Sequence, residues 1–266
     1  MTRFIYLCAD DFGLCHAIDA GILTLVRQQR LNNVSCMTDS PLWRQHGPAL
    51  RQYRSQLAAG LHFNLTEPLA TPCWPLRTLI IMAYLRRLPL AQIQHALHRQ
   101  LDRFEAIWGH PPDFVDGHQH IQLLPGLRSL ICRLLQQRYP GNPPWLRDSQ
   151  PAQPSSSSKH LVLTVLAQRF RQQCKARGFS LNHRLTGIYS LSGDNHYPAR
   201  LQHWLQHANN GVMLMCHPAH HGIACSAPHG LARQQEFAAL TGQNFIAQLH
   251  REGVTLRPFA QRFAPG

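Results

Sequence analysis

The sequence predicts an α/β protein built around a mostly parallel sheet, and three patterns lead to that expectation. Short apolar runs alternate with longer segments of helical periodicity, as in repeated β-α units. The first run, from Phe4 to Ala9, is apolar throughout, as expected of a strand buried on both faces of a parallel sheet. No G-x-G-x-x-G or Walker sequence follows it, which weakens the case for a nucleotide-binding open sheet. These patterns alone leave both a closed barrel and an open doubly wound sheet possible.

The remaining elements follow from the spacing of apolar residues. A helix over residues 90–108 is the clearest, with Gly109 as its expected C-terminal stop. Two further helices are expected over residues 16–29 and 126–137. Further strands are expected at residues 34–38, 60–66, 114–116, 145–148, 187–191, 212–216 and 254–256.

The length of 266 residues suits one large α/β domain. The one low-complexity stretch, residues 149–159, is rich in Ser and Pro and predicts a flexible surface loop. Because β-α alternation continues on both sides of this stretch, we expect a single domain over residues 1–266.

The formal net charge of +13 is unusual, and nearly all of it comes from arginine. Such a charge could attract nucleic acid or an anionic membrane surface. However, the arginines are spread along the chain without a run of five, and no nucleic-acid-binding motif accompanies them. We therefore expect a basic surface and no specific nucleic-acid partner.

Cysteine usage and hydropathy indicate a cytoplasmic protein with free thiols. The eight cysteines form no C-x-x-C pair and no zinc-finger spacing. The N-terminus lacks a secretory apolar region and cleavage site. The apolar run at residues 76–90 is interrupted by arginines and a proline, so no membrane span is expected. A homodimer is left open.

Acids and imidazoles occur where the predicted strands end. Asp10 and Asp11 follow the first strand, and His62 lies in the third. Asp116 and His118 end the fourth strand. His217 closes the strand at residues 212–216. Because parallel strands bind ligands at their carboxyl ends, these side chains are expected to converge on one point.

Each of these residues also has a structural interpretation. Asp10 and Asp11 would point in opposite directions in a regular strand, unless a turn at residues 12–13 brings both to the mouth of the sheet. They could instead cap the following helix. His62 could be a hydrogen-bonded core histidine.

The segment Asp116-Gly117-His118-Gln119-His120 is the most specific of these motifs. If it is extended, His118 and His120 share a face, and Gly117 allows the backbone to approach a ligand closely. The histidines at positions 217, 220 and 221 could simply form a polar loop.

Two histidines and one carboxylate can form a facial metal site that leaves positions open for water and substrate. Imidazole and carboxylate ligands suit zinc, and also iron, manganese or magnesium, and composition does not choose among them. The absence of cysteine pairs argues against a closed structural zinc site.

The motifs and their order resemble the YdjC-like carbohydrate deacetylases, a group that includes chitooligosaccharide deacetylases. The resemblance covers most of the chain, from residue 9 to residue 219, and the combination of its first two motifs is specific. The motifs are Ala9-Asp10-Asp11-Phe12-Gly13-Leu14, Gly60-Leu61-His62-Phe63-Asn64-Leu65-Thr66, Val115-Asp116-Gly117-His118-Gln119-His120 and Met215-Cys216-His217-Pro218-Ala219.

This resemblance implies a distorted (β/α) barrel related to polysaccharide deacetylases. It implies a divalent metal ion, Mg²⁺ or Zn²⁺, held by Asp11, His62 and His118. It also implies Asp10 as the catalytic base and His217 as the acid. Arg147 resembles the family's strand-end arginine that orients the site.

The chain departs from the family pattern at three places. Gln122 stands where members commonly have another histidine, the helix after the first motif begins Cys15-His16, and the segment after Thr66 is short and rich in proline. None of these departures removes an expected ligand, but they bear on which sugar fits.

The expected function is hydrolysis of an N-acetyl group on an amino sugar, an acetylated oligosaccharide or a glycolipid. Three alternatives stay open from the residues alone. One is another metal-dependent amidase or a phosphoesterase, and the second is a carbohydrate-binding paralogue without turnover. The third is a nucleic-acid-binding protein, suggested only by charge.

Overall fold

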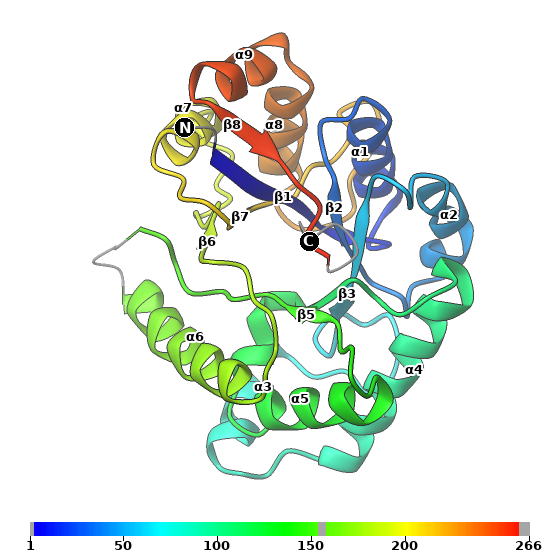
Figure 1. Cartoon of the computed structure of the whole chain (residues 1–266). Coiled ribbons are helices and arrows are strands. Elements are labelled where there is room, and N and C mark those ends of the chain that lie inside the picture. Colours follow the sequence, from blue (N-terminus) through cyan, green and yellow to red (C-terminus); the bar gives the residue numbers. More distant parts are fainter. Residues whose placement is uncertain (1–2, 154–157, 261–266) are drawn as a thin grey trace.

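The computed structural model describes residues 3–153 and 158–260, in which a parallel sheet curls into a distorted barrel (Figure 1). The strands run in the order β5-β4-β3-β2-β1-β7-β6, and β8 pairs with the start of β1. Their bounds are β1 (Arg3–Phe12), β2 (Asn33–Cys36), β3 (Ala58–Phe63), β4 (Phe114–Gly117), β5 (Trp145–Leu146), β6 (Leu185–Thr186), β7 (Val212–Cys216) and β8 (Val254–Leu256).

The two edges of this sheet, β5 and β6, meet only through isolated bridges. Leu146 at the end of β5 bridges to Leu181, and Pro151 bridges to Leu185 in β6. Both bridges are parallel, like every strand pairing in the described sheet. The expected distorted barrel is thus confirmed, and its least regular seam lies between β5 and β6.

Helices surround the curled sheet on its outside (Figure 1). In the described residues they are α1 (His16–Arg27), α2 (Pro41–Arg51), α3 (Leu76–Tyr84), α4 (Leu90–Trp108), the 3-10 helix η1 (His118–Leu123), α5 (Leu127–Arg138), α6 (Ser158–Ala176), α7 (Tyr197–Gln206), α8 (Gly230–Thr241) and α9 (Gln243–Arg251). Two large apolar clusters fill the space between these helices and the outer face of the sheet.

Alternation along each strand separates the two faces of the sheet. In β1, Ile5, Leu7 and Ala9 pack outward into the cluster beneath the helices. Tyr6 and Cys8 point inward, into a third and smaller cluster inside the barrel. This period of two is the geometry of an extended chain, and it fixes which residues reach the barrel interior.

The C-terminal segment closes the amino-terminal end of the barrel interior. The ring of Phe259 lies 4.9 Å from the ring of Tyr6, 5.5 Å from that of Phe114 and 4.9 Å from that of Trp145, measured between centroids. Phe259 is fully buried. An apolar plug therefore fills this end, and polar side chains occupy the inward positions at the carboxyl ends of the strands.

Those inward positions carry the residues expected to do chemistry. Outward neighbours such as Val34, Leu61, Val115, Leu146 and Cys216 belong to the two outer clusters, so the residues next to them point inward. The inward polar residues at the carboxyl ends are Asp10, Ser35, His62, Asp116, Arg147 and His217.

The expected element boundaries hold best for long or strongly apolar segments. The helix at 90–108 and the strands at 212–216 and 254–256 have the predicted bounds. Gly109 ends α4 in the left-handed conformation with φ 89°. The strand predicted at residues 187–191 is wrong, because the chain pairs earlier, over Leu185–Thr186. Gly187 turns away at φ +90°, where a Cβ atom would lie 2.2 Å from the carbonyl oxygen of Met215.

The predicted flexible loop at residues 149–159 coincides only in part with the structure. Residues 154–157 lie outside the described residues, and α6 already begins at Ser158. Before the gap, Ser149 is fully buried and Pro151 pairs with β6. Among the described helices, none combines the length and apolarity needed to cross a bilayer.

Candidate metal centre and active site

A cavity of about 310 Å³ opens at the carboxyl ends of the strands. Its walls come from the ends of β1, β3, β4 and β7 and from the loops after β3, β6 and β7. The lining residues are Asp10, Asp11, Leu14, His62, Glu67, Gly117, His118, Gln119, His120, Gly187, Ile188, Tyr189, Leu191, Met215, His217, Pro228, His229 and Arg233.

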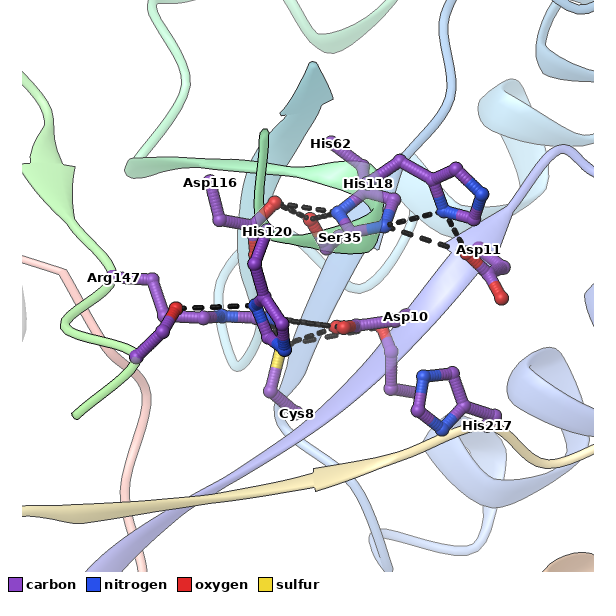
Figure 2. A network of polar contacts seen from close by, with 12 residues as sticks. Cys8, Asp10, Asp11, Ser35, His62, Asp116, His118, His120, Arg147 and His217 are labelled. Atoms are coloured by element: carbon purple, nitrogen blue, oxygen red, sulfur yellow. Dashed lines mark hydrogen bonds and ion pairs between the residues drawn. The ribbon is translucent and has the colours of Figure 1, made fainter. Parts of the chain in front are cut away.

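Three of these side chains converge on one point. Oδ1 of Asp11 lies 3.4 Å from Nε2 of His62 and 3.1 Å from Nδ1 of His118. The two imidazole nitrogens are 3.3 Å apart, and all three residues are buried (Figure 2). One atom from each therefore lies within 4.8 Å of the others, a spacing compatible with a shared metal ion.

A bulge in β1 brings Asp11 into this cluster. By strict alternation Asp11 would point outward, away from its neighbour Asp10. Instead Asp11 adopts φ 69°, and the pairing of β1 with β2 shifts register between Ala9 and Phe12. We expected a turn at residues 12–13 to do this, but the irregularity lies within the strand. Both adjacent carboxylates consequently reach the cavity.

The two imidazoles are held by their second nitrogens. Nδ1 of His62 lies 2.6 Å from Oδ1 of Asp116 and 3.0 Å from Oγ of Ser35. Nε2 of His118 lies 3.2 Å from Oε1 of Glu67. Such contacts fix the orientation of a metal-binding imidazole and increase its basicity. The nitrogens facing Asp11 are thereby positioned as ligands.

Asp11 is held in the same way on its outer oxygen. Nη2 of Arg233 donates to Oδ2 of Asp11 at 2.7 Å, which leaves Oδ1 facing the two histidines. Although burial raises the pKa of Asp11, hydrogen bonds from His118 and His62 and the charge of Arg233 hold it well below its usual value. The carboxylate is therefore ionised, as a metal ligand must be.

The pKa of His62 shows that this region favours positive charge. Burial lowers it, but the carboxylates of Asp116, Asp11 and Asp10 outweigh burial and raise it to about 10. A divalent cation would neutralise the same excess of negative charge. The donor set, its spacing and its supporting contacts thus fit a divalent metal ion, with oxygen and nitrogen ligands that suit both Mg²⁺ and Zn²⁺.

Asp10 belongs to a separate ion-paired group. Nη1 and Nη2 of Arg147 each lie 2.6 Å from an oxygen of Asp10, and Nη2 is also 2.6 Å from Oδ2 of Asp116. All three residues are buried. Burial raises the pKa of Asp10, but Arg147 outweighs it and lowers the pKa to about 2. Asp10 therefore lines the cavity as a carboxylate held in a fixed orientation.

His217 lies beside Asp10, on the side away from Arg147 (Figure 2). Its backbone N–H donates to Oε2 of the buried Glu236, whose Oε1 accepts from the hydroxyl of Tyr189 at 2.6 Å. Burial lowers the pKa of His217 to about 4, and burial raises that of Glu236 to about 7. Nδ1 of His217 is 4.0 Å from Oε1 of Glu236. A neutral imidazole thus lines the same cavity as the metal cluster.

The segment around His120 differs from the expected extended chain. His118 begins a 3-10 turn in which Gln119 and His120 have φ 55° and 58°, so the two histidines do not share one face. His120 turns toward Ser149, with Nδ1 at 3.2 Å from Oγ. Gly117 lines the cavity and also packs against Gln122, whose Oε1 lies 2.7 Å from where a Cβ would be.

The remaining sequence-derived candidates fall outside the metal cluster. Gln122 donates to Oγ of Ser149 and does not line the cavity, so this departure from the family pattern leaves the ligands untouched. His220 and His221 stack on each other at 5.0 Å between centroids. Neither lines the cavity, in agreement with their interpretation as a polar loop.

Sequence reasoning missed three charged residues of the site: Glu67, Arg233 and Glu236. Glu67 follows a recognisable motif but carries no periodic signal of its own. Arg233 and Glu236 did carry one, because with Phe237 and Leu240 they form the buried i, i+3, i+4, i+7 stripe of α8. Two charges in a core-facing stripe indicate an internal polar contact.

Comparison with known proteins agrees with this architecture. The family model described as YdjC-like protein matches residues 4–251. The chain belongs to the YdjC-like family. A chitooligosaccharide deacetylase of Yersinia pestis (strain Pestoides F) is 25% identical over 276 residues, covering 97% of this chain and 99% of that protein.

Solved structures show the same fold at low identity. A protein of Enterococcus faecalis V583, provisionally assigned to cellobiose-phosphate cleavage, superposes with a TM-score of 0.70 at 18% identity, covering 97% of this chain and 98% of that one. A T48 deacetylase solved with substrate superposes at 0.50 with 13% identity, covering 97% and 89%. These likenesses support the curled parallel barrel of the YdjC-like chain.

Proposed function

We propose that this YdjC-like protein is a metal-dependent hydrolase that removes the N-acetyl group of an amino sugar. One observation carries the proposal: the cluster of Asp11, His62 and His118 shares a cavity with an ionised carboxylate, Asp10, and with the imidazole of His217. Amide hydrolysis needs this combination, because a proton must leave the attacking water and another must reach the departing nitrogen.

Asp11, His62 and His118 would hold the divalent cation, which when bound supplies Lewis acidity and lowers the pKa of a water molecule. Asp10 accepts the proton of the attacking water. Arg147 keeps Asp10 ionised and aimed at the cavity through two hydrogen bonds of 2.6 Å. A carboxylate so held needs little reorganisation when the proton arrives.

His217 donates the proton that the departing amine requires. Its lowered pKa makes the imidazole neutral at rest and a strong acid once it has taken up a proton. Its position beside Asp10 allows the proton removed from water to be returned to the leaving group. The net reaction consumes one water and yields acetate and a free amine.

The substrate class rests on the size of the cavity and on the relatives. A cavity of about 310 Å³ accommodates an acetamido group and part of a sugar ring. The Yersinia pestis relative is named a chitooligosaccharide deacetylase, which favours N-acetylglucosamine oligomers as the first substrates to assay. Such a relative also argues against a carbohydrate-binding role without turnover.

Paired variants of the two adjacent carboxylates test this assignment. Asp10→Asn should lower kcat for acetate release by roughly 10²–10⁴-fold while leaving the bound metal unchanged, because it removes only a general base. Asp11→Asn should lose metal as well as activity. Acetate release from N-acetylglucosamine oligomers and elemental analysis of each purified variant measure both effects.

Asp194→Asn is the matched control, since Asp194 is ion-paired to Arg200 and does not line the cavity. It should behave like the wild type in both assays. Loss of metal from Asp10→Asn would reverse the two assigned roles. Release of phosphate from phosphate esters, with no acetate release from any amino sugar, would replace the proposed function by a phosphoesterase.

A further inference from the structure

Arg233 is a buried cation on the cavity wall, and one of its three nitrogens has no partner among the described residues. Its side chain is 5% exposed. Nη2 donates to Oδ2 of Asp11 at 2.7 Å, and Nε donates to the carbonyl oxygen of Pro228 at 2.9 Å. Nη1, in contrast, has no hydrogen-bond partner within residues 3–153 and 158–260.

The two hydrogen bonds that Arg233 makes fix the orientation of its guanidinium group and therefore the position of Nη1. A guanidinium group is planar, so anchoring Nε and Nη2 leaves its plane no freedom to rotate. A buried donor without a partner is unfavourable, and more so when it is charged. Arg233 lines the cavity and its Nη1 is buried in the cavity wall, so we look for the missing acceptor in a ligand oxygen that packs against this wall.

Asp11 connects this donor with the metal cluster. Its Oδ2 accepts from Arg233, while its Oδ1 faces the histidines, 3.1 Å from Nδ1 of His118. Arg233 and the cluster are therefore on the same wall. Arg147, the other buried arginine at the strand ends, engages Asp10 and Asp116 and does not line the cavity. Of these two arginines, only Arg233 belongs to the cavity lining.

We infer that Arg233 is a further catalytic residue, whose Nη1–H donates to the oxygen of the substrate acyl group. This inference rests on the proposed deacetylation. As water adds to the acyl carbon, that oxygen gains negative charge, and a fixed cationic donor stabilises the charge more than it stabilises the neutral amide. The same N–H then holds a carboxylate oxygen of the acetate product.

Arg233→Lys separates this role from the support that Arg233 gives to Asp11. A lysine keeps a positive charge near Asp11 but lacks the planar pair of nitrogens that can serve two acceptors at once. We expect kcat to fall by roughly 10²–10³-fold, with KM changed by only a few-fold and metal content retained. Arg138→Lys is the control, because Arg138 pairs with Asp102 and Glu105 away from the cavity.

A second variant keeps the inference testable if the lysine disturbs folding. Arg233→Gly leaves a space that added guanidinium ion can fill. Guanidinium at millimolar concentration should restore activity to this variant. It should not restore Arg147→Gly, because Arg147 is buried and its guanidinium group is enclosed by Asp10 and Asp116. Restoration with unchanged metal content supports a direct donor. Restoration that only tracks regained metal would overturn it in favour of a positioning role.

Acetate binding provides a readout that does not depend on turnover. Saturation-transfer NMR with sodium acetate, on metal-free protein, should show contact with the wild type and at least a tenfold loss of affinity in Arg233→Lys. Neutral acetamide is the matched probe and should distinguish the two proteins far less. Equal acetate binding by wild type and variant would overturn the inference.

The two proposals fail in different ways. If the wild type releases no acetate from any amino sugar, the proposed function fails. In that case carboxylate binding at Arg233, measured on the metal-free protein, still decides whether its Nη1 contacts a ligand. If the wild type is an active deacetylase and Arg233→Lys retains wild-type kcat, only the role of Arg233 is rejected.

Discussion

Two buried clusters of acids and imidazole lie side by side in this protein and share His62. In one, His62 meets Asp11 and His118, and in the other it meets Asp10 and Asp116. In both, the candidate ligand atoms lie within 4.8 Å of one another, and every residue is buried. By residue type, spacing and burial alone, the two are equivalent candidates for a metal site.

The charge between the acids distinguishes the two clusters. In the second cluster the guanidinium of Arg147 lies 2.6 Å from both Asp10 and Asp116 and supplies a permanent cation. In the first, Arg233 contacts only the outer oxygen of Asp11, so the inner side faces two imidazoles. Buried carboxylates must be neutralised, by a fixed side chain or by an exchangeable ion. On this comparison we propose the first cluster, and not the second, as the metal site.

Removing the fixed cation is the strongest test of this comparison. Arg147→Met leaves Asp10 and Asp116 buried without their partner, and this should lower the free energy of unfolding by about 3–5 kcal/mol. Urea unfolding of the metal-free proteins measures the loss. Added Mg²⁺ or Zn²⁺ should recover more stability in Arg147→Met than in the wild type, because a second cation site has been opened.

Two control variants sharpen that result. Arg138→Met removes a part-exposed arginine from acids on α4 and should cost no more than about 1 kcal/mol. Adding Asp10→Asn to Arg147→Met should return part of the lost stability, because it removes one of the two buried carboxylates that have lost their arginine partner. If Arg147→Met unfolds like the wild type, Arg147 is not the cation that fills the second cluster.

The outer contacts of the first cluster predict a smaller effect. Glu67 holds Nε2 of His118, and Glu67→Gln replaces a carboxylate by a weaker, neutral acceptor. We expect roughly 10–100-fold weaker metal binding, measured by calorimetric titration of the metal-free protein. Glu105→Gln, on α4 outside the cavity, should bind metal like the wild type. An unchanged affinity in Glu67→Gln would show that His118 is not a ligand through Nδ1.

Much of this site could be predicted from sequence because alternation and parallel strands impose it. Once residues 4–9, 60–66 and 114–116 are strands, His62 and Asp116 must reach the same end of the sheet. The position of Arg147 follows in the same way from β5. The family resemblance added the expected roles of these residues as metal ligands, base and acid, which the geometry alone does not supply.

The rest could not be predicted because it depends on contacts between distant segments. The left-handed backbone at Asp11 is stabilised by Arg233, 222 positions away in the sequence. The turn at His120 depends on Ser149, which becomes its neighbour only when the barrel curls. The strand predicted at 187–191 is apolar enough, but Gly187 packs against the backbone of Met215 and ends the pairing earlier. Only Arg233 carries a local signal, the buried stripe of α8, and that signal does not identify its partner.

Another buried carboxylate, Glu236, extends the comparison to an acid with neutral hydrogen-bond partners. It accepts from the hydroxyl of Tyr189 and the backbone N–H of His217. Burial raises its pKa to about 7, whereas the pKa of Asp10, which has an arginine, falls to about 2. The folded protein therefore binds a proton at Glu236 more tightly than the unfolded chain does.

This difference predicts the most gradual of the effects. A raised carboxyl pKa gives stability that is complete below the unfolded value, near 4.5, and is lost as pH rises through about 7. Glu236→Gln cannot titrate, so its stability relative to the wild type should increase over this range by at most about 1.4 kcal/mol per pH unit. Urea unfolding of both proteins between about pH 5 and pH 8 measures the difference, in which the other titrating groups cancel. A difference that stays flat with pH would mean that Glu236 is ionised throughout, and that neutral partners are enough to hold a buried carboxylate here.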